Sequence, residues 1–301
     1  MLNPILSFSV TRRMRSPKTI LIVAAWLAVL LGISVLTMGS LFGRQANLYN
    51  LRSGLTCYAV LLLAQFFLLV LIAPAMTSGA IAGERERQTL ELLLVTNTRP
   101  LRIVLGKAME SFAVLLLLIV CGLPVMCLPL TVGAVTLSQI LAGELFLLAI
   151  AFGAVCVGIL ASSLSRSTVV SSVISYILLL LIGFVTALPL FAEPGEAVTN
   201  VVYDSAKLSA LTPSRALSMI PPLLLVNPGY ALAALLQGQL KIFSDVMQYH
   251  EMGRLLCEFR LMDRLGGQTA ALISCGVITV MGAVMLLLAA AAVRGKSRAA
   301  R

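Results

Sequence analysis

Long apolar runs, separated by short polar connections, dominate the hydrophobic pattern of this chain. A helix needs about 20 mostly apolar residues to cross a bilayer. Runs of about that length or longer lie at residues 20–38, 55–82, 111–130, 139–164, 169–191 and 268–293. We therefore predict an all-α polytopic membrane protein with six transmembrane helices, forming a single transmembrane domain over residues 1–301.

Prolines and small residues add detail to this pattern. Pro74 lies inside the second run and predicts a kink, whereas Pro124 and Pro129 mark the end of the third. The fourth run is rich in small residues, which let membrane helices pack closely. They include Gly153, Ala154, Gly158 and Ala161.

Residues 216–240 are also free of charge, but a proline pair at 221–222 and an Asn-Pro-Gly triplet at 227–229 interrupt them. Such sequences break a continuous helix. We predict a broken segment that is partly embedded in the membrane, or helices that lie on its surface. A seventh span is the alternative.

The composition indicates that lipid surrounds most of the chain. Hydrophobic residues make up 59% and charged residues 11% of the sequence, and the mean hydropathy is +1.02. Soluble domains are about 45–50% apolar and about 25% charged. The net charge of +10 lies largely beside the apolar runs, so topology and anionic lipid explain it better than nucleic acid does.

The basic residues also predict the orientation. They cluster before the first run, between the second and third, between the fourth and fifth, and after the sixth. Cytoplasmic connections carry the excess of Lys and Arg, so we expect both termini in the cytoplasm and residues 193–267 outside it. A seventh span would place the basic C-terminus outside, which argues against it.

Residues 1–18 precede the first span. Ile5, Leu6 and Phe8 are followed by basic residues, and Pro17 separates this segment from the span. The pattern predicts a short amphipathic elbow helix in the cytoplasmic interface. The alternative is a charged tail that only fixes the orientation.

The chain offers little chemistry of its own. His250 is the single histidine, and the sequence has no HExxH, no CxxC and no GxxxxGK[ST] motif. Glu110 and Glu144 stand at the ends of spans, so an acidic relay is missing, which argues against a proton- or ion-driven pump. We expect no catalytic, metal-binding or cofactor-binding residue, and a separate subunit that supplies the energy.

One stretch, GERERQTLELLLVT at residues 83–96, concentrates charge that the chain otherwise avoids. Residues 84–95 are good helix formers, Glu84 and Glu91 stand at pairing distance from Arg87, and leucines at 90, 93 and 94 form an apolar patch. Residues 97–100 end this helix, and Pro100 suits the start of the next. Such a two-sided helix suits docking into a protein groove, and a charge run that anchors two spans is the alternative.

This stretch resembles the cytoplasmic segment between spans two and three of ABC-2 type permeases, the membrane subunits of ABC exporters. The residues that match the family pattern are Gly83, Glu84, Arg85, Glu86, Thr89, Leu90, Glu91, Leu93, Leu94, Thr96, Arg102, Gly106 and Lys107. The chain departs from the pattern at Asn97, where the family usually has proline. The elbow and the Asn-Pro pair at 227–228 show weaker similarity.

The resemblance implies that residues 83–110 form a cytoplasmic coupling region that docks on a separate ABC ATP-binding subunit, where Mg-ATP is hydrolysed. The residues implied in this contact are Glu84, Arg85, Glu86, Arg87, Thr89, Leu90, Glu91, Leu93 and Leu94. It also implies a dimer, with a second copy or a related permease, in the cytoplasmic (inner) membrane of a prokaryote. This chain would then form the translocation path of an exporter and would not itself be an enzyme.

Two other functions compete with this one. The chain would be a non-transporting scaffold or assembly factor if the charged helix only recruits a cytoplasmic partner. A membrane enzyme with its site in residues 193–267 is disfavoured because catalytic groups are missing. A neighbouring gene with a P-loop and an ABC signature would favour the exporter.

Overall fold

The computed structural model describes residues 16–42, 51–88, 100–191, 220–240 and 267–299, together with residues 212, 218 and 261. These ranges contain helices and turns and no β-strand. The helices are α2 (Pro17–Phe42), α3 (Leu51–Thr77), α4 (Ala82–Glu86), α6 (Pro100–Met126), α7 (Leu128–Thr131), α8 (Leu137–Leu164), α9 (Thr168–Ala187), the 3₁₀ helix η1 (Leu188–Phe191), α13 (Pro222–Leu225), α14 (Pro228–Leu240) and α16 (Gly267–Ala299).

Six segments of the described chain are long and apolar enough to cross a membrane, and each contains one of the six predicted runs. The second and third segments reach beyond their runs, to Glu86 and back to Leu101. The all-α polytopic fold class is confirmed. Polar residues fix where two of these helices begin. Ser16 Oγ accepts a hydrogen bond from the Thr19 amide at 3.3 Å and caps α2. The Thr136 amide donates to Gln139 Oε1 at 2.8 Å in the capping box of α8.

The prolines at 100, 124 and 129 mark helix ends or starts as predicted, whereas Pro74 lies inside a continuing helix. α3 continues through Pro74 and ends at Thr77, five residues before the predicted end of the second span at residue 82. Pro100 opens α6, as predicted, and α6 runs without a break into the third span. Pro124 lies in the last turn of α6 and Pro129 lies in α7, which confirms that the third span ends there.

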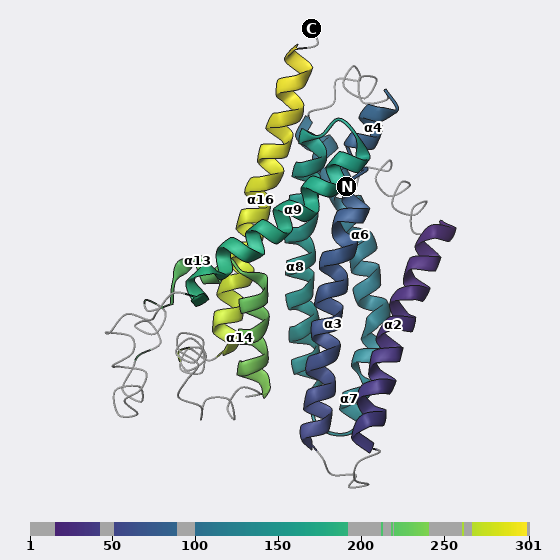
Figure 1. Ribbon diagram of the computed structural model, residues 1–301, viewed down its shortest axis with the longest axis vertical. Coiled ribbons are helices and arrows are strands. Elements are labelled where there is room, and N and C mark those ends of the chain that lie inside the picture. Colours follow the sequence, from purple (N-terminus) through teal and green to yellow (C-terminus); the bar gives the residue numbers. More distant parts are fainter. Residues whose placement is uncertain are drawn as a thin grey trace. The chain divides into compact units, whose positions relative to one another are not determined.

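The chain divides into two compact units, Met1–Leu179 with Thr279–Arg301, and Leu180–Ile278. In the first unit α8 is the central helix, because it makes the most extensive contacts with both α3 and α6, while α2 packs on α3 and α6 (Figure 1). Of the 18 consecutive residues of α8 that best fit a membrane span, 72% are buried, whereas the same share for α2 is 22%. The predicted small residues of α8 are indeed buried, and a Cβ at Gly158 would overlap the Thr77 hydroxyl of α3.

The second unit contains the predicted break at residues 227–229. Asn227 Oδ1 accepts hydrogen bonds from the amides of Gly229 at 2.8 Å and Tyr230 at 3.1 Å, so Asn227 caps α14. Its Nδ2 donates to the Gly183 carbonyl at 3.0 Å. The 13 residues of α14 measure about 20 Å, which is too short for a hydrocarbon core of about 30 Å. The structure therefore supports the broken segment rather than a seventh span.

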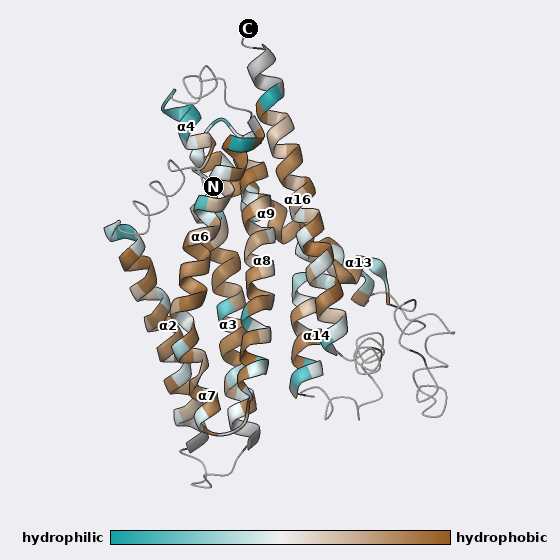
Figure 2. Cartoon of the chain, turned by 180° about the vertical axis from the view of Figure 1, so that it is seen from behind, coloured by the Kyte–Doolittle hydropathy of each residue, from teal (hydrophilic) through white to brown (hydrophobic). Residues whose placement is uncertain are grey.

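The long helices consist mostly of apolar residues, as a lipid environment requires (Figure 2). Exposed side chains on α9 include Val169, Val173 and Leu180. The predicted elbow, apart from its last residues, and most of residues 193–267 lie outside the described residues, so both remain predictions.

Candidate functional site

Helix α4 lies at the end of the first unit opposite α7 (Figure 1). Its N-cap position is Ile81, a residue whose side chain cannot accept a hydrogen bond. Ser162 of α8 replaces the missing cap. Its Oγ accepts hydrogen bonds from the amides of Ile81 at 3.0 Å and Ala82 at 2.9 Å, and it donates to the Ser78 carbonyl at 2.8 Å. Ser162 is fully buried, so these bonds attach the start of α4 to α8.

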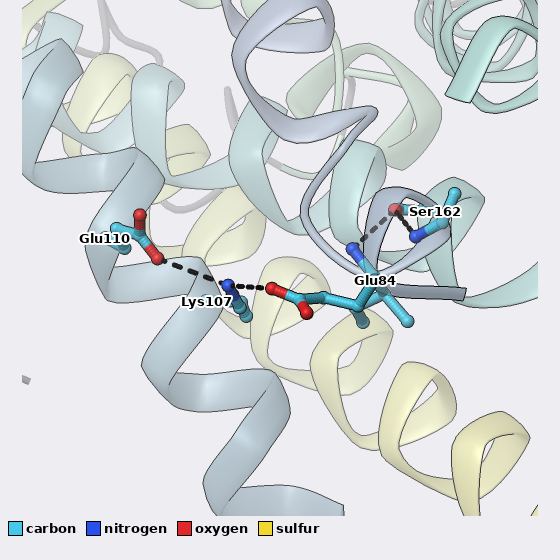
Figure 3. Close-up of polar contacts among 6 residues, drawn as sticks. Glu84, Lys107, Glu110 and Ser162 are labelled. Carbon is cyan, nitrogen blue, oxygen red and sulfur yellow. Dashed lines mark hydrogen bonds and ion pairs between the residues drawn. The ribbon is translucent and has the colours of Figure 1, made fainter. Parts of the chain in front are cut away.

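An ion pair attaches α4 to α6. Lys107 Nζ lies 2.9 Å from Glu84 Oε1 and 3.7 Å from Glu110 Oε2 (Figure 3). The side chains of Lys107 and Glu84 are 26% and 28% exposed, so water screens the pair only in part. Glu84 therefore pairs with Lys107 on α6, whereas helical spacing had indicated Arg87 as its partner.

Arg85 makes a third attachment, to the last residues of α8. Its Nη2 donates to the Ser163 carbonyl at 3.3 Å, and its Nη1 donates to the Ser165 carbonyl. The last carbonyls of a helix have no partner within that helix and carry partial negative charge. A guanidinium group at this point satisfies them, and it holds α4 against the end of α8.

The far side of α4 is exposed. Glu86, Arg87 and Gln88 are exposed, whereas Glu84 and Arg85 are partly covered. The helix ends at Glu86, and Gln88 takes a left-handed backbone conformation with φ 57° while its amide donates to the Arg85 carbonyl. Such a residue ends a helix. The prediction of one unbroken helix over residues 84–95 is therefore wrong at this point.

The predicted contact residues thus fall into three groups. Glu84 and Arg85 bind to α6 and α8 of their own chain, and Glu86 and Arg87 remain exposed. The others lie outside the described residues, and their contact with a partner stays a prediction. These are Thr89, Leu90, Glu91, Leu93 and Leu94.

A sequence profile described as "ABC-2 family transporter protein" matches residues 44–291, most of the chain. The chain belongs to this family. No curated protein matches it. Together with the six candidate spans, membership identifies a multi-pass membrane permease of an ABC transporter, and it implies association with an ATP-binding subunit.

The sequence analysis of this permease missed Ser162 as a functional residue. Ser162 lies about 80 residues from the amides that it binds, so no local pattern links them. The available signal was a polar group, Ser162 with Ser163 and Ser165, at the end of an otherwise apolar span. Among the described residues no metal-binding group of three or more His, Cys, Asp or Glu side chains comes together.

Proposed function

We propose that this permease is the translocation subunit of an ABC exporter, and that α4 couples it to a separate ATP-binding subunit. The observation that supports this most strongly is the two-sided environment of α4. Its inner side is bonded to α6 and α8, and its outer edge leaves Glu86 and Arg87 exposed. An anchored helix with exposed charges is suited to receive a partner and to pass on its movement.

The route of that movement follows from the bonds. The hydrogen bond from Ala82 to Ser162 makes α4 move with the end of α8. The ion pair between Glu84 and Lys107 links α4 to the N-terminal part of α6 as well. α6 and α8 have the most extensive contact of all the helix pairs in the first unit. A displacement of α4 by the partner would therefore shift the two central helices of this unit, which is how a packed interior transmits strain.

In this proposal Glu86 and Arg87 contact the ATP-binding subunit, and Glu84 and Arg85 hold α4 in place. ATP and Mg²⁺ bind to the partner. The permease works as a dimer, with a second copy or a related permease, in the inner membrane of a prokaryote with both termini in the cytoplasm. The family resemblance supports the dimer and the export direction, and the distribution of basic residues supports the orientation.

Charge reversal on the exposed edge tests the proposal. The double variant Glu86→Lys with Arg87→Glu should reduce co-purification of the co-expressed ATP-binding subunit at least about tenfold, because charges at a contact rim are reversed. Arg294→Glu, at an exposed position on α16, is the control and should change nothing. Membrane insertion should stay normal in both.

Normal co-purification of the double variant would contradict the coupling role of this edge. If the unaltered chain co-purifies with the ATP-binding subunit but shows no ATP-dependent transport in lipid, the scaffold function is favoured instead.

A further inference from the structure

A second polar site lies inside the first unit, among α2, α3, α6 and α8. Its members are Glu144 on α8, which is 4% exposed, Gln65 on α3, which is 0% exposed, and Trp26 on α2, which is 2% exposed. Glu144 follows the first residue of α8 by seven positions, about 10 Å along the axis. Glu144 therefore lies in the first part of its span, near one end as predicted, and packing buries it among neighbouring helices. Hydrophilic residues interrupt the apolar stretches of α3 and α8 (Figure 2).

The contacts within this cluster leave charge uncompensated. Gln65 Nε2 donates to Glu144 Oε2 at 3.2 Å. Within the described ranges, Glu144 Oε1, Gln65 Oε1 and Trp26 Nε1 are buried and have no hydrogen-bond partner. No basic side chain of those ranges lies within 4.0 Å of Glu144. A buried carboxylate with one hydrogen bond costs several kcal/mol, on the order of the stability of a whole domain, unless a positive charge joins it.

Within the described ranges, the other charged residues of these four helices stand well along the helix axes from the cluster. Tyr58 on α3 is the titratable side chain that lies next to Glu144, and its hydroxyl donates to the Gln139 carbonyl at 3.0 Å. The remaining charged residues of the four helices lie at least about two helical turns along from the cluster. They are Lys18, Arg52, Arg102, Lys107 and Glu110.

The packing limits the size of a ligand. A Cβ at Gly122 would lie 3.0 Å from Gln65 Nε2 and 3.3 Å from Trp26 Nε1. A Cβ at Gly143, beside Glu144, would lie 2.6 Å from the Tyr58 hydroxyl. Neighbouring side chains therefore fill the space beside both glycines. One carboxylate suits a single ion of charge +1, because a divalent ion would leave a net positive charge buried in the bundle, and the two free oxygens are the kind of ligand that hard cations prefer.

We propose that Glu144 and Gln65 form a binding site for one small monovalent cation within the bundle. The cation is either a proton carried by Glu144 or an alkali metal ion held by Glu144 Oε1 and Gln65 Oε1. Its presence removes the cost of the buried charge, so occupancy of the site controls how tightly α2, α3 and α8 pack. This proposal does not rest on the coupling role of α4.

The chain contains its own reporter for this site, since Trp26 is its only tryptophan. The test uses the full-length permease in nanodiscs of neutral lipid and records the emission of Trp26. In one arm NaCl replaces choline chloride at pH 8 and constant ionic strength. In the other arm the pH falls from 9 to 5 in choline chloride alone.

We expect a saturable one-site transition in at least one arm. A transition in the sodium arm identifies an alkali ion, and a transition in the pH arm alone identifies a proton. Glu144→Gln should abolish it, whereas Glu110→Gln, which removes a carboxyl group outside the cluster, should keep it. Gln65→Leu retains the carboxyl group and should shift the midpoint about tenfold in sodium or about one pH unit.

Two results would overturn the proposal. One is the lack of a saturable transition in both arms. The other is a transition that Glu144→Gln leaves unchanged. If Glu144→Gln does not fold, the Gln65→Leu titration decides, and an unshifted midpoint then refutes the site.

Discussion

Two buried polar sites of the first unit differ in how well their groups are satisfied. At the junction of α4 and α8, the neutral hydroxyl of Ser162 accepts from two amides and donates to one carbonyl. In the cluster of α2, α3 and α8, the carboxyl group of Glu144 has a single hydrogen bond from Gln65, and three polar atoms of the cluster are without a partner in the described structure.

The difference indicates two kinds of role. A satisfied neutral group costs little to bury and makes a stable joint, which suits the transmission of movement. An incompletely satisfied charge lowers stability unless a ligand completes it, and intramembrane ionisable groups commonly mark functional sites. Substitutions can separate the two roles.

The largest effect is expected from Gly158→Val. Its side chain would overlap Thr77 and force α3 away from α8, next to the junction. We expect the free energy of unfolding to fall by about 3 kcal/mol, or the protein to fail to fold, as measured by thermal unfolding in detergent. Gly32→Val is the matched control, because a Cβ at Gly32 meets nothing within 4 Å. Equal stability of the two variants would refute the tight α3–α8 contact.

Ser162→Ala should have the next largest effect. It leaves two buried amides without an acceptor, at a cost of about 2 kcal/mol. The variant should insert normally and retain the ATP-binding subunit but lose most ATP-dependent transport. Ser171→Ala removes a buried hydroxyl that has no partner in the described structure, so it should change stability by less than about 0.5 kcal/mol. Full transport by Ser162→Ala would remove this joint from the coupling route.

The same change from Glu to Gln should have opposite effects on stability at Glu144 and at Glu84, which pairs with Lys107. Glu144→Gln removes a buried charge, and in choline buffer at pH 9, where the site is empty, it should stabilise the protein by about 1 kcal/mol. Glu84→Gln weakens the ion pair with Lys107 and should destabilise it by about 0.5 kcal/mol. Parallel unfolding curves measure both, and two changes of the same sign would contradict the comparison.

The smallest effect is expected when the two charges of the Glu84–Lys107 ion pair are exchanged. Glu84→Lys and Lys107→Glu should each lower stability by up to about 1 kcal/mol, and the double variant should recover about half of the loss, because Glu110 still faces position 107. Additive losses in this double-mutant cycle would show that the pair does not join α4 to α6.

The sequence was sufficient for the spans. Each apolar run has the length that the bilayer demands, and Pro17, Pro100 and the Asn-Pro-Gly triplet at 227–229 mark helix starts through local backbone rules. The end of α4 was predicted wrongly, because the good helix formers after Glu86 do not reveal that Gln88 adopts a left-handed conformation.

The two polar sites could not be predicted in this way. Ser162 and the amides of α4 meet only because α8 packs beside the end of α3, about 80 residues away in the chain. The position of Glu144 near one end of its span follows from the sequence, but its burial depends on helices that the local pattern does not include. The signal that was available is the presence of Gln65 and Trp26 within otherwise apolar spans.

Photo-crosslinking tests the central claim, that the exposed edge of α4 contacts the ATP-binding subunit. A benzophenone amino acid is placed at Arg87, and in a second variant at Leu145, which is 67% exposed on α8. Membranes that contain both subunits are then irradiated. We expect a covalent adduct with the ATP-binding subunit from position 87 and none from position 145. No adduct from position 87, or equal adducts from both positions, would contradict the claim.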